Sequence, residues 1–186
     1  MRKIGFGLES GVYDHRRAMH KDFSDELAQT AFGTATRLGI ETACTVIFGH
    51  PDETRADMQT SIDFVKACEI DYVEFHLMVV IPGTPLFDRA LAEGKLTADV
   101  FDRFMRGECA YPEYAPGDIS PQEMRAIHRR AIQEFYFRPA YFKRALKRLW
   151  RNPADAVQVA KTARSLMDRS HLTRPAWAVG RRRMNG

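Results

Sequence analysis

In KIGFGLESG (residues 3–11), a short apolar run passes directly into a glycine-rich turn. Two later stretches repeat this arrangement, IETACTVIFGHPDET (40–54) and DYVEFHLMVVIPGTP (71–85). In each, an apolar, β-branched run typical of a strand precedes a segment with helical patterning. Strands that are joined by helices pair in parallel, through right-handed crossovers. The first half of the chain therefore predicts three βα units around a parallel sheet.

Capping residues mark the ends of the helices between these strands. Helices are expected over about 25–38, 54–69 and 85–94. Their end signals are Ser24 with Gly39, Thr54 with Asp57, and Pro85 with Gly94. A serine or threonine before a helix accepts hydrogen bonds from its first free N–H groups, and an acid three residues later returns one. Proline fits the first helical turn, and glycine commonly follows the last.

The pattern is helical throughout the second half of the chain. Helices are expected over about 97–106, 120–137, 139–150 and 153–169. Thr97 is the expected cap of the first of these. The sequence SPQE (120–123) starts the second with an N-cap serine, a proline and a glutamate at the third helical position. Between them lies a loop rich in proline, glycine and tyrosine, at 107–118.

The composition is that of an ordinary globular protein with one domain. The chain has 186 residues, of which 45% are hydrophobic. No apolar run approaches the ~20 residues that cross a membrane, and the start lacks a signal-peptide pattern, so a cytoplasmic location is expected. Cys44, Cys68 and Cys109 are far apart in the sequence. Small buried thiols are therefore expected, rather than a disulfide framework or a CxxC metal site.

Positive charge gathers towards the carboxyl end of the chain. Residues 138–186 hold 13 basic and two acidic side chains, whereas the rest of the chain is acidic. The run FYFRPAYFKRALKRL (135–149) interleaves aromatic rings with lysine and arginine, a pattern compatible with binding to nucleic acid or to a membrane surface. A helix that packs on the body of the protein and turns a basic face to solvent is the simpler interpretation.

The three glycine-rich turns should lie at one edge of the sheet, because parallel strands all end on the same side. Ligands of α/β proteins bind at that edge. In the first turn, Gly7 and Gly11 allow a backbone to approach a ligand closely. The carboxylate of Glu9 can accept two hydrogen bonds from a diol such as ribose, and Ser10 adds a small donor and acceptor. A pairing of Glu9 with a nearby lysine or arginine is the alternative.

The second and third turns have simpler structural explanations. Gly49 shapes the turn GHPDET, and Glu53 is favourably placed at the start of a helix. Gly83 lies between two prolines that stiffen the exit from the third strand. His76, on that strand, shares a face with Glu74 by strand alternation. It is either a histidine of the core or a group that faces a ligand.

Taken in order, GLESG, GHPDET, PGTPLF and EGKL (93–96) resemble the motifs of the radical S-adenosylmethionine (SAM) superfamily. The chain is most similar to the branch that often carries a cobalamin-binding domain, in which a lysine-containing segment follows the first motif, as Lys21 does here. The likeness covers about residues 2–150. It implies half of a partial (β/α)6 TIM-like barrel. It also implies an enzyme that cleaves SAM reductively at a [4Fe–4S] cluster, so that a 5′-deoxyadenosyl radical acts on the substrate.

The resemblance also implies roles for individual residues. The expected cofactor-binding residues are Gly7, Glu9, Ser10, Gly11, Phe48, Gly49, His76, Pro82 and Gly83. Glu9 and Ser10 would fall on the strand whose end contacts the ribose or methionine part of SAM. Phe48 and Gly49 would line the adenine side, and Pro82 with Gly83 would close the barrel near adenine. Cobalamin is a further candidate cofactor of this branch. Catalytic residues and the substrate, a small molecule or a lipid-like compound, are left open.

Two departures from the family pattern bear on this interpretation. Asp52 stands where the second motif usually has glycine, and the cluster-binding CxxxCxxC is absent. No metal ligand is therefore expected in this chain, and an N-terminal half or a partner chain would carry the cluster. We expect a half-barrel (1–94), a helical extension (95–170) and a basic flexible tail (171–186). We expect the chain to be inactive as an enzyme when it is alone. The alternative is a non-catalytic protein with a SAM-like pocket that docks on RNA, a membrane or a partner through its basic helices.

Overall fold

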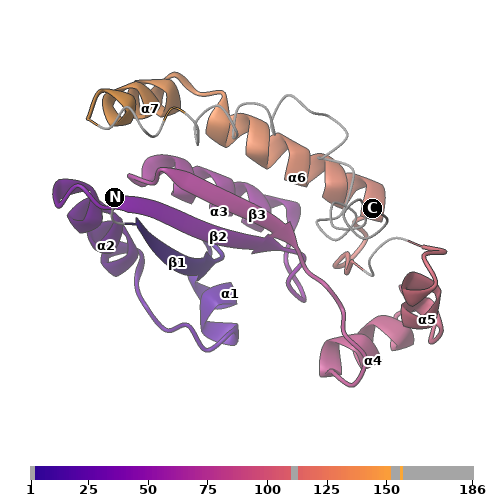
Figure 1. The fold of residues 1–186 in the computed structure, drawn as a ribbon. Coiled ribbons are helices and arrows are strands. Elements are labelled where there is room, and N and C mark those ends of the chain that lie inside the picture. Colours follow the sequence, from indigo (N-terminus) through magenta and orange to yellow (C-terminus); the bar gives the residue numbers. More distant parts are fainter. Residues whose placement is uncertain (1–2, 110–112, 152–155, 157–186) are drawn as a thin grey trace.

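The computed structural model describes residues 3–109, 113–151 and 156, and all structural statements below concern these residues. Three strands, β1 (Lys3–Glu9), β2 (Glu41–Phe48) and β3 (Tyr72–Leu77), form one sheet in the order β1-β2-β3 (Figure 1). Both neighbouring pairs are parallel, and Cys44 of β2 lies beside Phe6 on one side and Val73 on the other. The predicted parallel sheet is therefore confirmed.

Seven helices accompany the sheet in the described part of the chain. They are α1 (Tyr13–Ala18), α2 (Asp25–Arg37), α3 (Arg55–Ala67), α4 (Pro85–Ala92), α5 (Val100–Met105), α6 (Pro121–Tyr136) and α7 (Pro139–Arg151). The predicted caps are confirmed for α2, α3 and α6, because Ser24, Thr54 and Ser120 each accept a hydrogen bond from the third helical residue. Asp57 completes the capping box of α3.

The structure corrects three details of the sequence prediction. Helix α1 was not expected, since its six residues are too few to show a helical period. Helix α5 begins after Asp99 rather than after Thr97, because the Thr97 hydroxyl is bound 2.5 Å from the Asp99 carboxylate. Strand β3 ends at Leu77 rather than near residue 80, and Val79 instead makes an antiparallel bridge to Glu113. The predicted helix at 153–169 and the tail at 171–186 lie outside the described residues.

One face of the sheet carries the hydrophobic core. Alternate side chains of the strands point to this face, where they meet residues of α2, α3, α6 and α7. The strand residues of the core are Leu8, Cys44, Val46, Phe48, Val73 and Phe75. Helix α6 runs alongside β3 in Figure 1, and the Tyr136 hydroxyl donates to the carbonyl oxygen of Val73 across 2.9 Å. A smaller core formed with α4 and α5 surrounds Val80 and Tyr114.

The other face of the sheet, here called the uncovered face, holds no hydrophobic core among the described residues, although Tyr72 at the start of β3 is buried on it. None of its side chains belongs to either hydrophobic core, and Glu74 and His76 are exposed on it. Apolar strands of this kind are typical of parallel sheets covered on both faces, whereas the half-barrel that the resemblance implies leaves one face without its covering strands. A parallel sheet with one bare face is what an incomplete barrel presents, because the missing strands would fill its interior.

Candidate functional site

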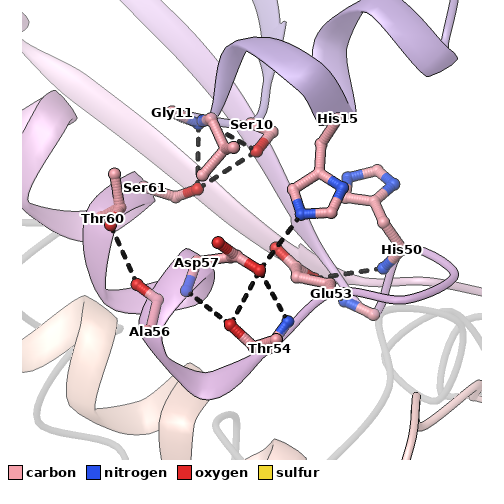
Figure 2. A network of polar contacts seen from close by, with 12 residues as sticks. Ser10, Gly11, His15, His50, Glu53, Thr54, Ala56, Asp57, Thr60 and Ser61 are labelled. Atoms are coloured by element: carbon pink, nitrogen blue, oxygen red, sulfur yellow. Dashed lines mark hydrogen bonds and ion pairs between the residues drawn. The ribbon is translucent and has the colours of Figure 1, made fainter.

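The carboxyl ends of β1 and β2 bring two of the three predicted turns together. Ser10 and Gly11 follow β1 and contact Ser61 of α3, the helix that the GHPDET turn begins (Figure 2). The PGTP turn is not part of this arrangement. Pro82 and Gly83 are exposed on the long connection from β3 to α4 (Figure 1). The described structure therefore has a site at the ends of β1 and β2, with PGTP further out.

Glu9 has an unusual backbone and an incompletely bonded carboxylate. Its φ is +66°, in the left-handed region, and the pairing of β1 with β2 shifts register between Gly7 and Glu9. The ammonium group of Lys21 lies 2.5 Å from Oε1 of Glu9 and donates to the Gly7 carbonyl oxygen at 2.9 Å. The second oxygen, Oε2, is buried and has no hydrogen-bond partner. The pairing with a lysine is thus present, and it leaves one acceptor atom of Glu9 to be satisfied.

Ser10 and Gly11 fasten the first turn to α3. The backbone N–H of Gly11 donates to the Ser61 hydroxyl at 2.9 Å, and the hydroxyls of Ser10 and Ser61 lie 3.3 Å apart (Figure 2). Ser10 and Ser61 are both fully buried. A Cβ atom on Gly11 would come within 2.6 Å of the Ser61 Cα. In the described structure, the close approach at Gly11 is therefore to a helix of the same chain.

Arg16 of α1 supports the same turn and was missed by the sequence analysis. Its side chain is completely buried, donates to the Ser10 carbonyl oxygen at 3.0 Å and pairs with Asp25. The guanidinium lies 5.1 Å from the centre of the Phe23 ring and 5.8 Å from that of Phe64. A buried arginine needs such partners, because desolvation of its charge is otherwise costly. No local sequence signal distinguishes it from the neighbouring Arg17, which is exposed.

The GHPDET turn is held by a buried glutamate. Oε2 of Glu53 accepts hydrogen bonds from the backbone N–H groups of Gly49 (2.6 Å) and His50 (3.1 Å), while Oε1 is buried without a partner. Burial raises the pKa of the Glu53 carboxyl to about 7. Gly49 has a φ of +99°, and a Cβ atom there would lie 2.7 Å from the Tyr114 carbonyl oxygen. The Phe48 side chain faces the core and stacks on Phe75, so only its backbone lies towards the turn.

Two histidines lie beside this turn. Nε2 of His15 is 3.3 Å from the Asp57 carboxylate, and the rings of His15 and His50 are stacked with centres 6.0 Å apart (Figure 2). Burial lowers the pKa of His50, which favours its neutral form. Within the described residues, no cluster of three or more histidine, cysteine or acidic side chains has an arrangement that could hold a metal ion.

Asp52 occupies a position that suits glycine. Its φ is +66°, in the left-handed region that glycine adopts most readily, at the position where the resembled motif usually has glycine. The carboxylate binds the guanidinium of Arg89 at 2.6 and 3.2 Å, which lowers the pKa of Asp52. This ion pair links the turn to α4.

His76 is a group of the uncovered sheet face. Its side chain is 53% exposed, and its Nε2 lies 3.6 Å from Oε2 of Glu74. The interpretation of His76 as a histidine of the core is therefore wrong, and the interpretation as a group that faces the interior of a larger barrel stays open.

The cysteines lie apart from the site. Cys44 and Cys68 are buried in the main core, where burial raises the pKa of their thiols to about 12 and about 11. The Cys109 thiol donates to the Val100 carbonyl oxygen at 3.5 Å. All three are free.

Comparison with known proteins gives low-identity relatives, and no family model matches the chain. Over 136 residues it is 28% identical to an uncharacterized methyltransferase of Pyrococcus horikoshii, covering 73% of this chain and 29% of the relative. Over 97 residues it is 29% identical to a hopanoid C-2 methylase of Rhodopseudomonas palustris, covering 52% of this chain and 18% of that protein. The matched regions are thus less than a third of each relative. Both are named as methyl-transferring enzymes, and the similarity supports a methyltransferase-like family.

Proposed function

We propose that this chain supplies the nucleoside-binding edge of a radical SAM methylase, and that another polypeptide segment completes the barrel and carries the cluster. The motif order and the methyl-transferring relatives support this function. The observation that carries it is the Glu9 carboxylate. At the carboxyl end of β1, in an incomplete parallel sheet, it keeps one buried oxygen without a hydrogen-bond partner.

SAM has the hydrogen-bond donors that this oxygen lacks. Its ribose presents two hydroxyl donors, and a carboxylate oxygen is a strong acceptor for them. Lys21 occupies Oε1 of Glu9, so a ribose hydroxyl would bind Oε2. Arg16 and Ser61 hold the turn after β1 in place through their hydrogen bonds to the backbone of Ser10 and Gly11. When bound, SAM would supply the methyl group or the hydrogen-abstracting radical of the reaction, and the residues of this chain would bind and orient it.

The uncovered sheet face would contact the substrate. Thr45 lies between Gly7 and Glu74 in the strand register, and His76 follows on the same face. Nε2 of His76 and Oε2 of Glu74 lie 3.6 Å apart, and both side chains are exposed, so they would offer a polar surface to the substrate.

The cysteines of this chain do not fit an iron–sulfur cluster. Cys44 and Cys68 are core residues whose raised pKa values disfavour the thiolate that an iron ligand requires. A cluster would therefore be held by cysteines of another polypeptide segment. Cobalamin, which the branch resembled by these motifs often uses, would likewise be bound by a separate domain.

Nucleoside binding tests the role of Glu9. We expect the full chain, mixed with the segment that completes it, to bind adenosine about tenfold more tightly than 2′,3′-dideoxyadenosine, because the diol donates to a charged acceptor. Glu9→Gln should remove this preference. Glu108→Gln should keep it, since Glu108 pairs with Arg106 elsewhere on the surface. Equal affinity for both nucleosides in the unaltered protein would contradict the assignment.

Activity separates the enzyme from a non-catalytic binding protein, the alternative that the missing cluster motif favours. The chain alone, reconstituted anaerobically with iron and sulfide, should show no stoichiometric cluster absorbance and no SAM cleavage. Addition of a polypeptide with CxxxCxxC encoded beside it should restore both. A cluster on the isolated chain would show that the cysteines are misjudged, and a completed complex that binds SAM without cleaving it would favour the binding protein.

A further inference from the structure

The outward side of α7 carries an exposed apolar stripe. Phe142, Leu146 and Trp150 are 57%, 68% and 87% exposed. Because they are four residues apart, they lie along one side of the helix over about 12 Å. A surface helix of a globular protein normally turns such residues towards the body. A row of large apolar side chains that points to solvent instead marks a surface for a partner.

The stripe is not the packing face of a misplaced helix, because α7 already has one. Tyr141 and Ala145 are buried against the core. Arg144 binds the Asp71 carboxylate at 2.9 Å and the Glu69 carbonyl oxygen at 3.0 Å. The expectation that this helix packs on the body is therefore confirmed. The expected basic solvent face is also present, since Lys143 and Lys147 are exposed, and the apolar stripe lies beside it.

The charges around the stripe restrict what can cover it. Lys143 and Lys147 are exposed, and each directly follows a residue of the stripe. Helix α7 has no acidic residue. A second copy of α7 would bring lysines against lysines. The rest of this chain, residues 152–186, has seven basic and two acidic side chains and would also repel. An anionic occupant is favoured on electrostatic grounds.

We propose that α7 binds an anionic lipid surface. The stripe would enter the interfacial layer, while Lys143 and Lys147 contact the acidic head groups. Trp150, at the end of the stripe, is a residue type that prefers this boundary. A single-stranded RNA is less well matched, because the aliphatic Leu146 offers no ring on which a base can stack. None of the helices in the described residues is long and apolar enough to span a bilayer, so the binding would be peripheral.

This surface is separate from the nucleoside site. Arg144 fixes α7 to Asp71, which immediately precedes β3 at its amino end, whereas Glu9 lies at a carboxyl end of the same parallel sheet. The protein could therefore rest on a membrane with the proposed active edge free. The inference from α7 stands or fails independently of SAM binding.

Tryptophan fluorescence of the full chain tests this proposal. The sequence has two tryptophans, so Trp177→Phe leaves Trp150 as the only one. We expect phosphatidylglycerol-containing vesicles to shift its emission to the blue, brominated lipids to quench it, and pure phosphatidylcholine vesicles to do neither. Lys143→Gln should lower the partition coefficient about fivefold. Leu146→Gln should lower it about tenfold. Leu38→Gln, at an equally exposed apolar residue beyond α2, should leave it unchanged.

Several results would overturn the proposal. One is that the protein does not bind anionic vesicles, and another is that Leu38→Gln lowers the partition coefficient as much as Leu146→Gln does. A third is that the protein forms a dimer without lipid and that Leu146→Gln dissociates it. The proposal would also fail if the fluorescence of Trp150 showed tighter binding to an RNA oligonucleotide than to the vesicles. It would fail as well if Trp150 were shielded from acrylamide in the free monomer. Circular dichroism checks that the variants fold. The fluorescence measurement on the protein with Trp150 and an unaltered stripe does not depend on the folding of the stripe variants.

Discussion

The ammonium group of Lys21 lies 2.5 Å from Oε1 of Glu9, and this ion pair rests directly over Gly7. A Cβ atom at Gly7 would come within 2.6 Å of the Lys21 nitrogen and 2.7 Å of the Glu9 oxygen. The glycine therefore makes room for two other side chains of the chain itself. The second oxygen of Glu9 stays buried without a hydrogen-bond partner. Any ligand of Glu9 depends on this arrangement of three residues.

Gly7→Ala should weaken nucleoside binding without unfolding the protein. The atoms that a new methyl group would meet are the ends of two flexible side chains, so we expect the free energy of unfolding to change by less than about 1 kcal/mol. The displaced carboxylate should lower adenosine affinity about tenfold in the completed protein. Gly5→Ala is the matched control on the same strand face, because no heavy atom lies within 4 Å of its Cβ position. Equal affinities of the two variants would exclude the proposed role of the pair.

Gly11→Ala should destabilise the fold itself. Its Cβ would lie 2.6 Å from the Cα of Ser61 and 2.9 Å from the Cβ of Phe64, so α3 would have to move. Overpacking of this kind costs about 1–3 kcal/mol, which urea unfolding can measure. Gly33→Ala provides the contrast. In the interior of α2, with only the Arg37 side chain nearby at 3.5 Å, it should stabilise the protein by about 0.5–1 kcal/mol. A neutral Gly11→Ala would show that the turn adapts.

The sequence predicted the order of the elements well because their end signals are local. Ser24, Thr54 and Ser120 form their hydrogen bonds within three residues, so the chain positions alone contain the information. Strand β3 was predicted too long, since its end depends on a bridge between Val79 and Glu113 that no local pattern reveals. The bare sheet face follows from the half-barrel that the resemblance implies and not from the strands themselves, because an apolar strand looks the same with or without its covering layer.

The candidate site was predicted in position but only partly in its contacts. The edge of the sheet follows from parallel pairing, and Glu9 was identified at that edge. Two contacts could not be predicted from the sequence, the hydrogen bond of the Gly11 N–H group to the Ser61 hydroxyl and that of the buried Arg16 side chain to the Ser10 carbonyl oxygen. Both join residues that only the tertiary fold brings together. For the same reason, Gly7 and Gly11 were interpreted as room for a ligand, whereas a Cβ atom on either would meet other parts of this chain.

The outer edge of β1 should make the isolated chain self-associate. In the described residues this edge has no strand partner, Ile4 is 40% exposed on it, and an apolar hollow of about 220 Å³ lies between β1 and α2. Unpaired edges and apolar patches promote association. Ile4→Lys should therefore shift the protein towards monomer in light scattering, whereas Leu38→Lys, on the far end of α2, should not. A monomeric wild type with slow hydrogen exchange throughout 3–48 would mean that the domain is complete.

The buried carboxyl of Glu53 should make stability fall as the pH rises. Burial raises its pKa to about 7 in the folded protein, against an ordinary value of 4.5. Below pH 4.5 both the folded and the unfolded state carry the proton. Between about 4.5 and 7 the unfolded state releases it while the folded state retains it, so the free energy of unfolding decreases with pH. The full change is on the order of 3 kcal/mol, and it levels off above pH 7.

A neighbouring group works in the opposite direction, and the experiment must separate the two. Burial lowers the pKa of His50, so protonation of the unfolded state reduces stability as the pH falls below about 6.5. The difference between wild type and Glu53→Gln isolates the glutamate, because the amide does not titrate and His50 is common to both. We expect urea unfolding to show that wild type loses stability relative to Glu53→Gln between pH 4.5 and 7. His50→Gln in the same series should leave that difference in place. A difference that is independent of pH would mean that the Glu53 carboxyl titrates normally, held ionised by the N–H groups of Gly49 and His50.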